Sequence, residues 1–283
     1  MNTRLWTLRH GVWQLPAGGA IMGILNITPD SFSDGGEHGD TASALAHADK
    51  LLADGAHIID LGGESTRPGS AEVSIDEEAR RVLPVLRELR RRHPQALLSV
   101  DTRHAAVAEQ ALEAGADIIN DITGLADPAM RALCAAAPCG IVLMHMQGQP
   151  RTMQLAPHYD DVVREVRAFF EERLALAEAA GIARERICLD PGIGFGKNVE
   201  HNLALIAHLE ELRVENLPLL MALSRKRFMG AVLSGGAPAP VREALPTVVM
   251  SLLAADRGAD LHRVHDVREL RDALRLRRAV LGA

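Results

Sequence analysis

The sequence is poor in cysteine and has no long apolar run, and these shortages exclude several classes of protein. Cys134, Cys139 and Cys188 are odd in number and fit no zinc-binding spacing, so buried thiols in a reducing cytosol are favoured over a disulfide. No apolar run is long enough to cross a bilayer, and residues 1–19 contain no secretory signal. We therefore expect a cytoplasmic protein with no membrane partner.

Positive charge is also not in excess. The 283 residues carry a net charge of -6 with a pI near 6.1, which argues against a nucleic-acid partner and requires any basic site to be local. Lysine occurs only as Lys50, Lys197 and Lys226 among 31 basic residues, so a retained lysine suggests a chemical role. With 47% hydrophobic residues, the chain suits one large domain or two small ones.

A short motif recurs three times along the chain. It reads DGAHIID at residues 54–60, AGADIIN at 114–120 and RGADLHR at 257–263, each time after a stretch rich in Ala and Leu. In each copy we expect the glycine to end a helix and the apolar run after it to form a buried strand. The motif therefore predicts a repeated unit of a helix followed by a strand.

Other apolar segments continue this alternation. Eight strands are predicted, at residues 20–26, 57–61, 96–101, 117–121, 140–145, 186–190, 218–223 and 260–265. Amphipathic helices are predicted between them, for example at residues 75–92, 160–180 and 198–212. This pattern over about 250 residues is typical of a single (β/α)8 TIM barrel of the α/β class, with a doubly wound open sheet as the alternative. Because no linker divides the chain, we expect a short N-terminal extension at residues 1–19 and a barrel at residues 20–283.

Polar residues close every predicted strand, at the end where parallel barrels carry their active sites. They are Asn26, Asp60 leading to Glu64, Asp101, Asn120 with Asp121, His145, Asp190, residues 224–226, and Arg263 with His265. Any single Asp or Asn in such a position can instead cap the next helix. Their repetition at all eight strands favours a functional site.

Three loops after these strands are rich in glycine, proline and serine, at residues 26–36, 62–70 and 190–197. Glycine allows close backbone approach to a ligand and supplies N–H groups for an anion. Two of the five phenylalanines, Phe32 and Phe195, lie in these loops. Each can stack on a flat substrate or pack against its own loop, and the polar surroundings favour stacking.

The charged rim residues predict two faces of one site. Five cationic groups make a local anion site, with solvated arginines as the alternative reading: Arg67, Arg225, Lys226, Arg263 and His265. A helix expected after the SRK triplet, residues 224–226, also favours an anion. Carboxylate and amide groups suit the N–H groups of a heterocycle and can stabilise positive charge: Asp101, Asn120 and Asp190.

Eight motifs follow one another over about residues 21–267: NITPDSFSDGG, GESTRPG, VDT, IND, MHMQG, DPGIGFGK, SRK and RVHDV. In this order they resemble the dihydropteroate synthase family. The resemblance implies a transferase of folate biosynthesis that joins a dihydropterin pyrophosphate to p-aminobenzoate and releases pyrophosphate. It also implies that pyrophosphate leaves first, that loops 28–36 and 62–69 close over the site, and that p-aminobenzoate binds second.

The resemblance also implies roles for individual residues. Asn26 would coordinate the cofactor Mg²⁺ carried with the pyrophosphate. Contacts to the pyrophosphate are expected from Thr66, Arg263 and His265. Contacts to the pterin are expected from Asp101, Asn120, Asp190 and Lys226. The p-aminobenzoate pocket is expected to include Phe32, Pro68 and Phe195. Further substrate contacts are expected from Arg67 and Ser224. The predicted catalytic residues are Asp101, Lys226 and Arg263.

The family pattern is not followed everywhere, and two other functions compete. Ala222 stands where glycine is usual, Arg227 where serine is usual and His262 where an apolar residue is usual. A pterin-binding methyltransferase domain would not need the predicted pyrophosphate contacts. A non-enzymatic binding paralogue would be expected to lose loop residues that are present here. The family further implies a homodimer, for which the apolar segment 245–255 is a candidate interface.

Overall fold

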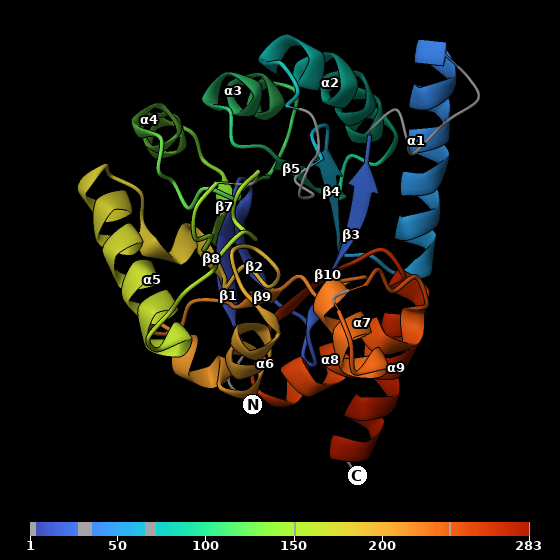
Figure 1. The fold of residues 1–283 in the computed structure, drawn as a ribbon. Coiled ribbons are helices and arrows are strands. Elements are labelled where there is room, and N and C mark those ends of the chain that lie inside the picture. The colour runs from blue at the N-terminus through green and yellow to red at the C-terminus, as the bar shows by residue number, and fades with distance from the viewer. Residues whose placement is uncertain (1–3, 28–35, 66–71, 150, 238, 283) are drawn as a thin grey trace.

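Eight parallel strands form a barrel with helices around its outside (Figure 1). The computed structural model describes residues 4–27, 36–65, 72–149, 151–237 and 239–282. The barrel strands are β3 (Ala20–Asn26), β4 (Ile58–Gly62), β5 (Leu97–Asp101), β6 (Ile118–Asp121), β7 (Gly140–Met144), β8 (Ile187–Asp190), β9 (Leu220–Met221) and β10 (Leu261–Val264). They pair in the order β8-β7-β6-β5-β4-β3-β10-β9, and a parallel bridge from Leu189 to Leu219 joins its two ends. The predicted TIM barrel is confirmed.

The helices follow the strands in chain order and cover the barrel. They are α1 (Gly36–Asp54), α2 (Ile75–Arg92), α3 (Ala105–Glu113), α4 (Pro128–Ala136), α5 (Val162–Ala179), α6 (Val199–Ala207), α7 (Arg227–Ser234), α8 (Ala244–Asp256) and α9 (Val267–Leu281). The short 3-10 turns are η2 (Arg184–Arg186) and η3 (Leu209–Leu212). The helix predicted at 198–212 is wrong in its second half, because α6 ends at Ala207 and η3 follows it.

Helix α2 has the predicted bounds, and its ends show why. Ser74 caps its start by accepting a hydrogen bond from the Glu77 amide. Its first turn is acidic and its last turn holds three arginines, an order that the helix dipole favours. By contrast, the strand predicted at 218–223 shortens to β9, because the chain turns after Leu223 and Arg225 adopts a φ of 57°.

Alternation along the strands separates two apolar layers. Side chains such as Ile59 and Leu61 point outward and pack against the helices, where they join the large outer core. Ile58 and its counterparts on the other strands point inward and fill the amino half of the barrel. The carboxyl half of the barrel interior is left to polar side chains.

The N-terminal segment forms a hairpin that covers the amino end of the barrel. Strands β1 (Leu5–Leu8) and β2 (Gly11–Gln14) pair antiparallel. Trp6 is fully buried within the inner apolar layer, and its indole N–H donates to the Arg186 carbonyl at 2.8 Å. Gly140 makes room for the hairpin, because a Cβ there would overlap Leu8. Strand β3 begins at Ala20, and the division of the chain at residue 19 stays a prediction.

Two expectations from composition can be compared with the structure. Cys134, Cys139 and Cys188 are buried and form no disulfide, as predicted. Within the part of the chain that the structure describes, none of the helices combines the length and the apolar composition that a membrane span requires.

Candidate active site

The carboxyl ends of β3 to β6 place four residues in one layer at the barrel mouth. The strand register pairs Asn26 with Gly62, Gly62 with Asp101, and Asp101 with Asn120. Asp60 lies two positions before Gly62, and therefore on the same side of β4 and one layer deeper. One wall of the mouth thus carries amide and carboxylate groups, with a gap at the glycine.

Arg263 on β10 reaches across the barrel interior to this wall. Its Nε donates to Asp60 Oδ2 at 2.6 Å, and its Nη2 donates to Asp101 Oδ2 at 2.7 Å. Asn120 Nδ2 donates to the same Asp60 oxygen at 3.2 Å. The prediction of separate acidic and cationic faces is wrong here, because two buried carboxylates side by side require a cation between them.

Asp60 belongs to this site, although the sequence reasoning did not include it among the substrate or catalytic residues. Its side chain is fully buried, and its Oδ1 has no hydrogen-bond partner among the described residues. The sequence does indicate this role, because Asp60 ends the first copy of the repeated motif at the position that Asn120 holds in the second copy and Arg263 in the third. The three equivalent positions of the repeated motif therefore meet in space.

Burial alters the proton affinity of these groups. It raises the pKa of Asp101 to about 7, while the Arg263 charge opposes the rise. Burial also raises the pKa of Asp190, and the hydrogen bond from the Gly192 amide opposes it. Burial alone would lower the pKa of Arg263, but Asp60 and Asp101 outweigh it, so this guanidinium stays charged.

Lys226 faces the mouth from the start of α7, and the predicted helix after it is confirmed. Its Nζ lies 4.4 Å from the centre of the Phe195 ring, a cation–π distance. A Cβ at Gly194 would come within 3.2 Å of the Lys226 side chain, so this loop passes close to the lysine. Burial lowers the pKa of Lys226 to about 8, against the attraction of Asp190. Both predicted residues, Phe195 and Lys226, are therefore brought together.

Ser224 and His265 form a second polar pair in the segments that follow β9 and β10. The Ser224 hydroxyl lies 2.9 Å from His265 Nδ1, and it accepts from the His265 amide at 3.2 Å. Arg225 does not join them: its side chain is exposed and pairs with Asp266 at 2.9 Å. The Arg225 backbone is left-handed, with a φ of 57°, and the expected convergence of its side chain with the other cations stays a prediction.

The capping alternative is wrong for the strand-end residue Asp121, because the N-cap of the next helix, α4, is Asp127. Asp121 accepts hydrogen bonds from the Thr123 amide at 2.8 Å, the Thr123 hydroxyl at 2.7 Å and the Leu125 amide at 2.8 Å. These bonds use its carboxylate to shape the loop after β6. Asn120, the residue before it, points into the barrel instead. His145 at the end of β7 also turns away from the mouth and contacts Lys197 at 2.9 Å.

Two glycines explain the conformation of the loop at residues 190–197. Gly192 has a φ of +66°, and a Cβ there would overlap the His145 carbonyl oxygen. Gly196 has a φ of +60°, and a Cβ there would overlap the Gln147 carbonyl oxygen. The loop after β8 thus lies directly on the loop after β7, which only glycine permits at these positions.

The positions that depart from the family pattern occupy different places. Ala222 is buried in the inner apolar layer, two positions before Ser224. His262 is buried on the helix side of β10, and burial lowers its pKa to about 4. Arg227 is exposed at the start of α7. Four predicted contacts lie outside the described residues: Phe32, Thr66, Arg67 and Pro68.

Asn26 fits the expected cation. Mg²⁺ prefers oxygen ligands and usually takes few from the protein, with substrate phosphate and water completing its shell. The Asn26 Oδ1 lies 4.0 Å from the place of an absent Gly62 Cβ, so the glycine leaves open space beside this oxygen and Asp101. These residues suit an ion that arrives with a phosphate-bearing substrate.

A separate acidic cluster lies beside the mouth. Glu64, Glu78 and His104 bring potential metal-ligand atoms within 4.8 Å of one another. Arg103 already occupies Glu64 with two hydrogen bonds, at 3.0 and 3.1 Å, and His104 lies 2.6 Å from Glu78. We interpret the cluster as an ion-pair network, because a guanidinium takes the place of a metal ion.

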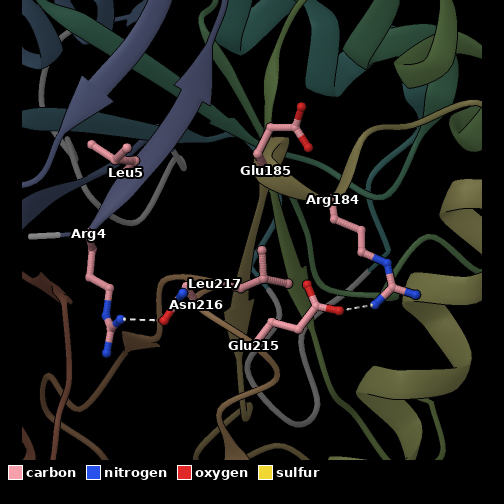
Figure 2. Close-up of a pocket in the computed structure, with 7 residues that line it drawn as sticks. All are labelled: Arg4, Leu5, Arg184, Glu185, Glu215, Asn216 and Leu217. Atoms are coloured by element: carbon pink, nitrogen blue, oxygen red, sulfur yellow. Dashed lines mark hydrogen bonds and ion pairs between the residues drawn. The ribbon is translucent and has the colours of Figure 1, made fainter. Parts of the chain in front are cut away.

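A hollow at the opposite end of the barrel is also lined by charged residues (Figure 2). Its lining consists of Arg4, Leu5, Arg184, Glu185, Glu215, Asn216 and Leu217. Arg4 donates to Asn216 at 3.0 Å, and Arg184 pairs with Glu215 at 2.8 Å. These residues precede β8 and β9 in the chain, so the hollow lies far from the polar mouth.

The same residues can be compared with known proteins. The model of the family described as "Pterin binding enzyme" matches residues 22–265. The dihydropteroate synthase of Escherichia coli K12 is 49% identical over 265 residues, covering 93% of this chain and 92% of that protein. The structure of Xanthomonas albilineans dihydropteroate synthase with 4-aminobenzoic acid matches with a TM-score of 0.90 at 43% identity over the full length of both chains. A complex of the Xanthomonas enzyme with 7,8-dihydropteroate matches with a TM-score of 0.83 at 43% identity over 94% of both chains. The chain therefore belongs to the dihydropteroate synthase family of pterin-binding transferases.

Proposed function

We propose that the barrel mouth condenses 6-hydroxymethyl-7,8-dihydropterin pyrophosphate with p-aminobenzoate. The bond between the pterin methylene carbon and the pyrophosphate oxygen breaks, and pyrophosphate leaves with the electron pair. The arylamine nitrogen then forms the new C–N bond and releases a proton. The observation that carries the proposal is the connected set of Asp60, Asp101, Asn120 and Arg263 beside Lys226 in one polar mouth.

The acidic and amide wall holds the pterin. Asp101, Asn120 and Asp190 present acceptors and a donor to the ring's amide-like edge, and Lys226 supplies a further donor. The positive charge that forms on the pterin when pyrophosphate leaves is stabilised by the preorganised carboxylate of Asp101. Burial makes this electrostatic effect stronger than it would be in water.

The neighbouring carboxyl ends of β3, β10 and β9 hold the pyrophosphate. Arg263 keeps its charge under all ordinary conditions, and the Ser224–His265 pair fixes the orientation of the imidazole. Asn26 and the pyrophosphate oxygens would hold Mg²⁺, which would neutralise negative charge on the leaving group. Thr66 and Arg67 complete this part of the proposal from the family resemblance.

The p-aminobenzoate lies near Phe195, whose ring already contacts Lys226. Because Phe32 and Pro68 come from two other loops, ordered binding follows: the pterin pyrophosphate binds first and completes the second pocket. Titration of p-aminobenzoate into the free protein and into protein saturated with Mg²⁺ and pyrophosphate tests this order. Equal affinities in the two titrations would refute it.

The chain also functions as a homodimer in this proposal. Exposed apolar side chains on α7 and α8 support it, with relative exposures of 69% for Leu233, 70% for Leu245 and 45% for Val249. Apolar surface of this extent on neighbouring helices suits a subunit interface. A cytoplasmic location is likewise proposed, supported by the three buried and unpaired cysteines.

A coupled assay of pyrophosphate release tests the function. Release should require both substrates and should fall when Mg²⁺ is removed. Pterin binding without release would support a non-enzymatic paralogue. Methyl transfer from methyltetrahydrofolate without pyrophosphate release would support the methyltransferase alternative, which the polar Arg263 and Ser224–His265 groups disfavour.

A further inference from the structure

Lys197 is a buried lysine whose ammonium is fully hydrogen-bonded inside the protein. Its exposure is only 3%. Its Nζ lies 2.9 Å from His145 Nδ1, 3.1 Å from the Gly192 carbonyl oxygen and 2.9 Å from the Phe195 carbonyl oxygen. An ammonium has three protons, and three acceptors surround this one. The lysine is therefore held by specific bonds and does not reach the substrates itself.

Two of these acceptors are carbonyls of the loop after β8. Gly192 also donates its amide to Asp190, at the start of the loop, at 2.7 Å. Phe195 presents its ring to Lys226, 4.4 Å from the ring centre. Lys197 thus bonds to the backbone of Gly192, which holds the predicted pterin contact Asp190. It also bonds to the backbone of Phe195, whose ring is a predicted p-aminobenzoate contact.

Neighbouring side chains hold the rest of the same loop. Asn202 on α6 accepts from the Gly194 amide at 2.7 Å, and Tyr159 donates to the Gly196 carbonyl at 2.9 Å. Lys197 donates to the Phe195 carbonyl and shares the Gly192 carbonyl with the Phe195 amide, which donates to it at 3.0 Å. Removing its ammonium would leave both carbonyls without this donor, while the bonds of Asn202 and Tyr159 would remain.

The lysine does not serve an acid–base role in the reaction as described. His145 accepts from Lys197 and packs edge-on against Phe169, with ring centres 4.8 Å apart. Burial lowers the pKa of His145 to about 2, so it is a neutral acceptor. Burial also lowers the pKa of Lys197 to about 7, a cost that a lysine needed only to fill space would not require. An apolar side chain of similar length would fill the same volume.

We infer that Lys197 is a positioning residue for the arylamine site, which it sets by holding the Gly192 and Phe195 carbonyls so that the Phe195 ring stays against Lys226. The inference rests on the proposed function. In this role Lys197 affects the affinity for p-aminobenzoate, while the residues of the mouth carry out the reaction.

Steady-state kinetics of Lys197→Met test the inference, with Lys50→Met as the matched control at an exposed lysine. Methionine keeps the length and removes the donors. We expect the KM for p-aminobenzoate to rise roughly 10- to 100-fold, as misplacement of a binding group by about 1 Å does. The Kd for the pterin pyrophosphate should rise less than this KM, because the Gly192 amide, and not Lys197, donates to the pterin contact Asp190. His145→Phe, which removes only one acceptor, should give a smaller rise of the same kind.

A second measurement does not depend on turnover. Labelling with fluorophenylalanine gives one ¹⁹F signal for each of the five phenylalanines, and Phe195→Leu identifies the signal of Phe195. In Lys197→Met this signal should shift, and in Lys50→Met it should not. If the wild-type protein releases no pyrophosphate, the proposed function fails, yet the signal still decides whether Lys197 holds Phe195.

Three results would overturn the inference. The first is an unchanged Phe195 signal. The second is a shifted signal with an unchanged KM for p-aminobenzoate. The third is an activity loss that only follows the loss of folded protein and affects both substrates equally. If Lys197→Met does not fold, the same readouts on His145→Phe decide the matter.

Discussion

At the scale of single residues, Arg263 determines how two carboxylates can lie side by side in the barrel mouth. Asp60 is fully buried and Asp101 is partly buried, and the guanidinium binds both at once. Two carboxylates alone at this distance would repel each other and favour protonation of one. The shared arginine offsets this repulsion by pairing with both carboxylates, so this site depends on a three-residue unit.

Asp101→Asn should keep the fold and lose most turnover. Removal of one preorganised electrostatic group commonly lowers kcat by about 10²- to 10³-fold. Steady-state rates and thermal unfolding of the purified variant measure the two effects separately. Asp121→Ala is the matched control, because Asp121 accepts three hydrogen bonds that stabilise a loop. This variant should lose on the order of 1–3 kcal/mol of stability and keep its turnover. A normal kcat in Asp101→Asn would remove Asp101 from the proposed catalytic residues.

Affinity for the pterin pyrophosphate should decline as the pH rises through about 8. Burial lowers the pKa of Lys226 to that value, so the ammonium that binds the substrate is present below it and is lost above it. Isothermal titration across this range gives the profile. Lys226→Arg stays charged and should lose the alkaline decline. An identical decline in both proteins would assign it to another group.

Lys226→Ala should weaken binding strongly without lowering thermal stability at neutral pH. Burial disfavours the charged form of Lys226, so the charged lysine destabilises the folded state at neutral pH. This destabilisation becomes smaller as the pH rises from the folded pKa of about 8 to the ordinary value of 10.5. An unchanged Kd for the pterin pyrophosphate would contradict a binding role for Lys226.

At the scale of elements, the β1–β2 hairpin closes the end of the barrel opposite the active site. Parallel barrels have an apolar interior that water would otherwise reach at the amino end. Trp6 covers that interior, with its N–H bonded to the Arg186 carbonyl. The hairpin therefore contributes to stability and leaves the chemistry to the loops at the other end.

Trp6→Ala should lower the free energy of unfolding by about 3–5 kcal/mol, as truncation of a buried aromatic residue does. Trp13→Ala on the partner strand is the control, and its partly exposed ring should cost less. Urea unfolding measures both. Activity per folded molecule should match the wild type in each variant, and equal destabilisation by the two would contradict the assigned role of Trp6.

At the scale of the whole molecule, the barrel presents an apolar surface on its late helices. The α8 sequence is apolar nearly all round, although only part of it is buried in this chain. Charged side chains cover most other helices, as the arginine-rich α2 illustrates. A second copy of the chain is the partner proposed for this surface.

The wild-type protein should sediment as a dimer at micromolar concentration, and Leu245→Arg combined with Val249→Arg should sediment as a monomer. Two buried charges at an interface without partners are strongly unfavourable. Leu155→Arg is the control, because Leu155 is 82% exposed and lies away from α8. Monomeric wild-type protein would contradict the proposed assembly.

The sequence by itself determined the barrel and the rim. Strand β3 and helix α2 have the predicted bounds, since alternation, caps and glycine stops are local signals. Because parallel strands end on one side, the polar residues that follow them had to meet at that side. Asp101, Asn120 and Arg263 could be placed together on this ground alone.

Only the tertiary structure decided which way each strand-end side chain turns. Asn120 and Asp121 are neighbours in sequence, yet one enters the barrel and the other shapes a loop. Arg225 pairs with Asp266, and three acceptors from two loops bind Lys197. Contacts of this kind join segments far apart in the chain, and their geometry depends on packing that no local pattern encodes.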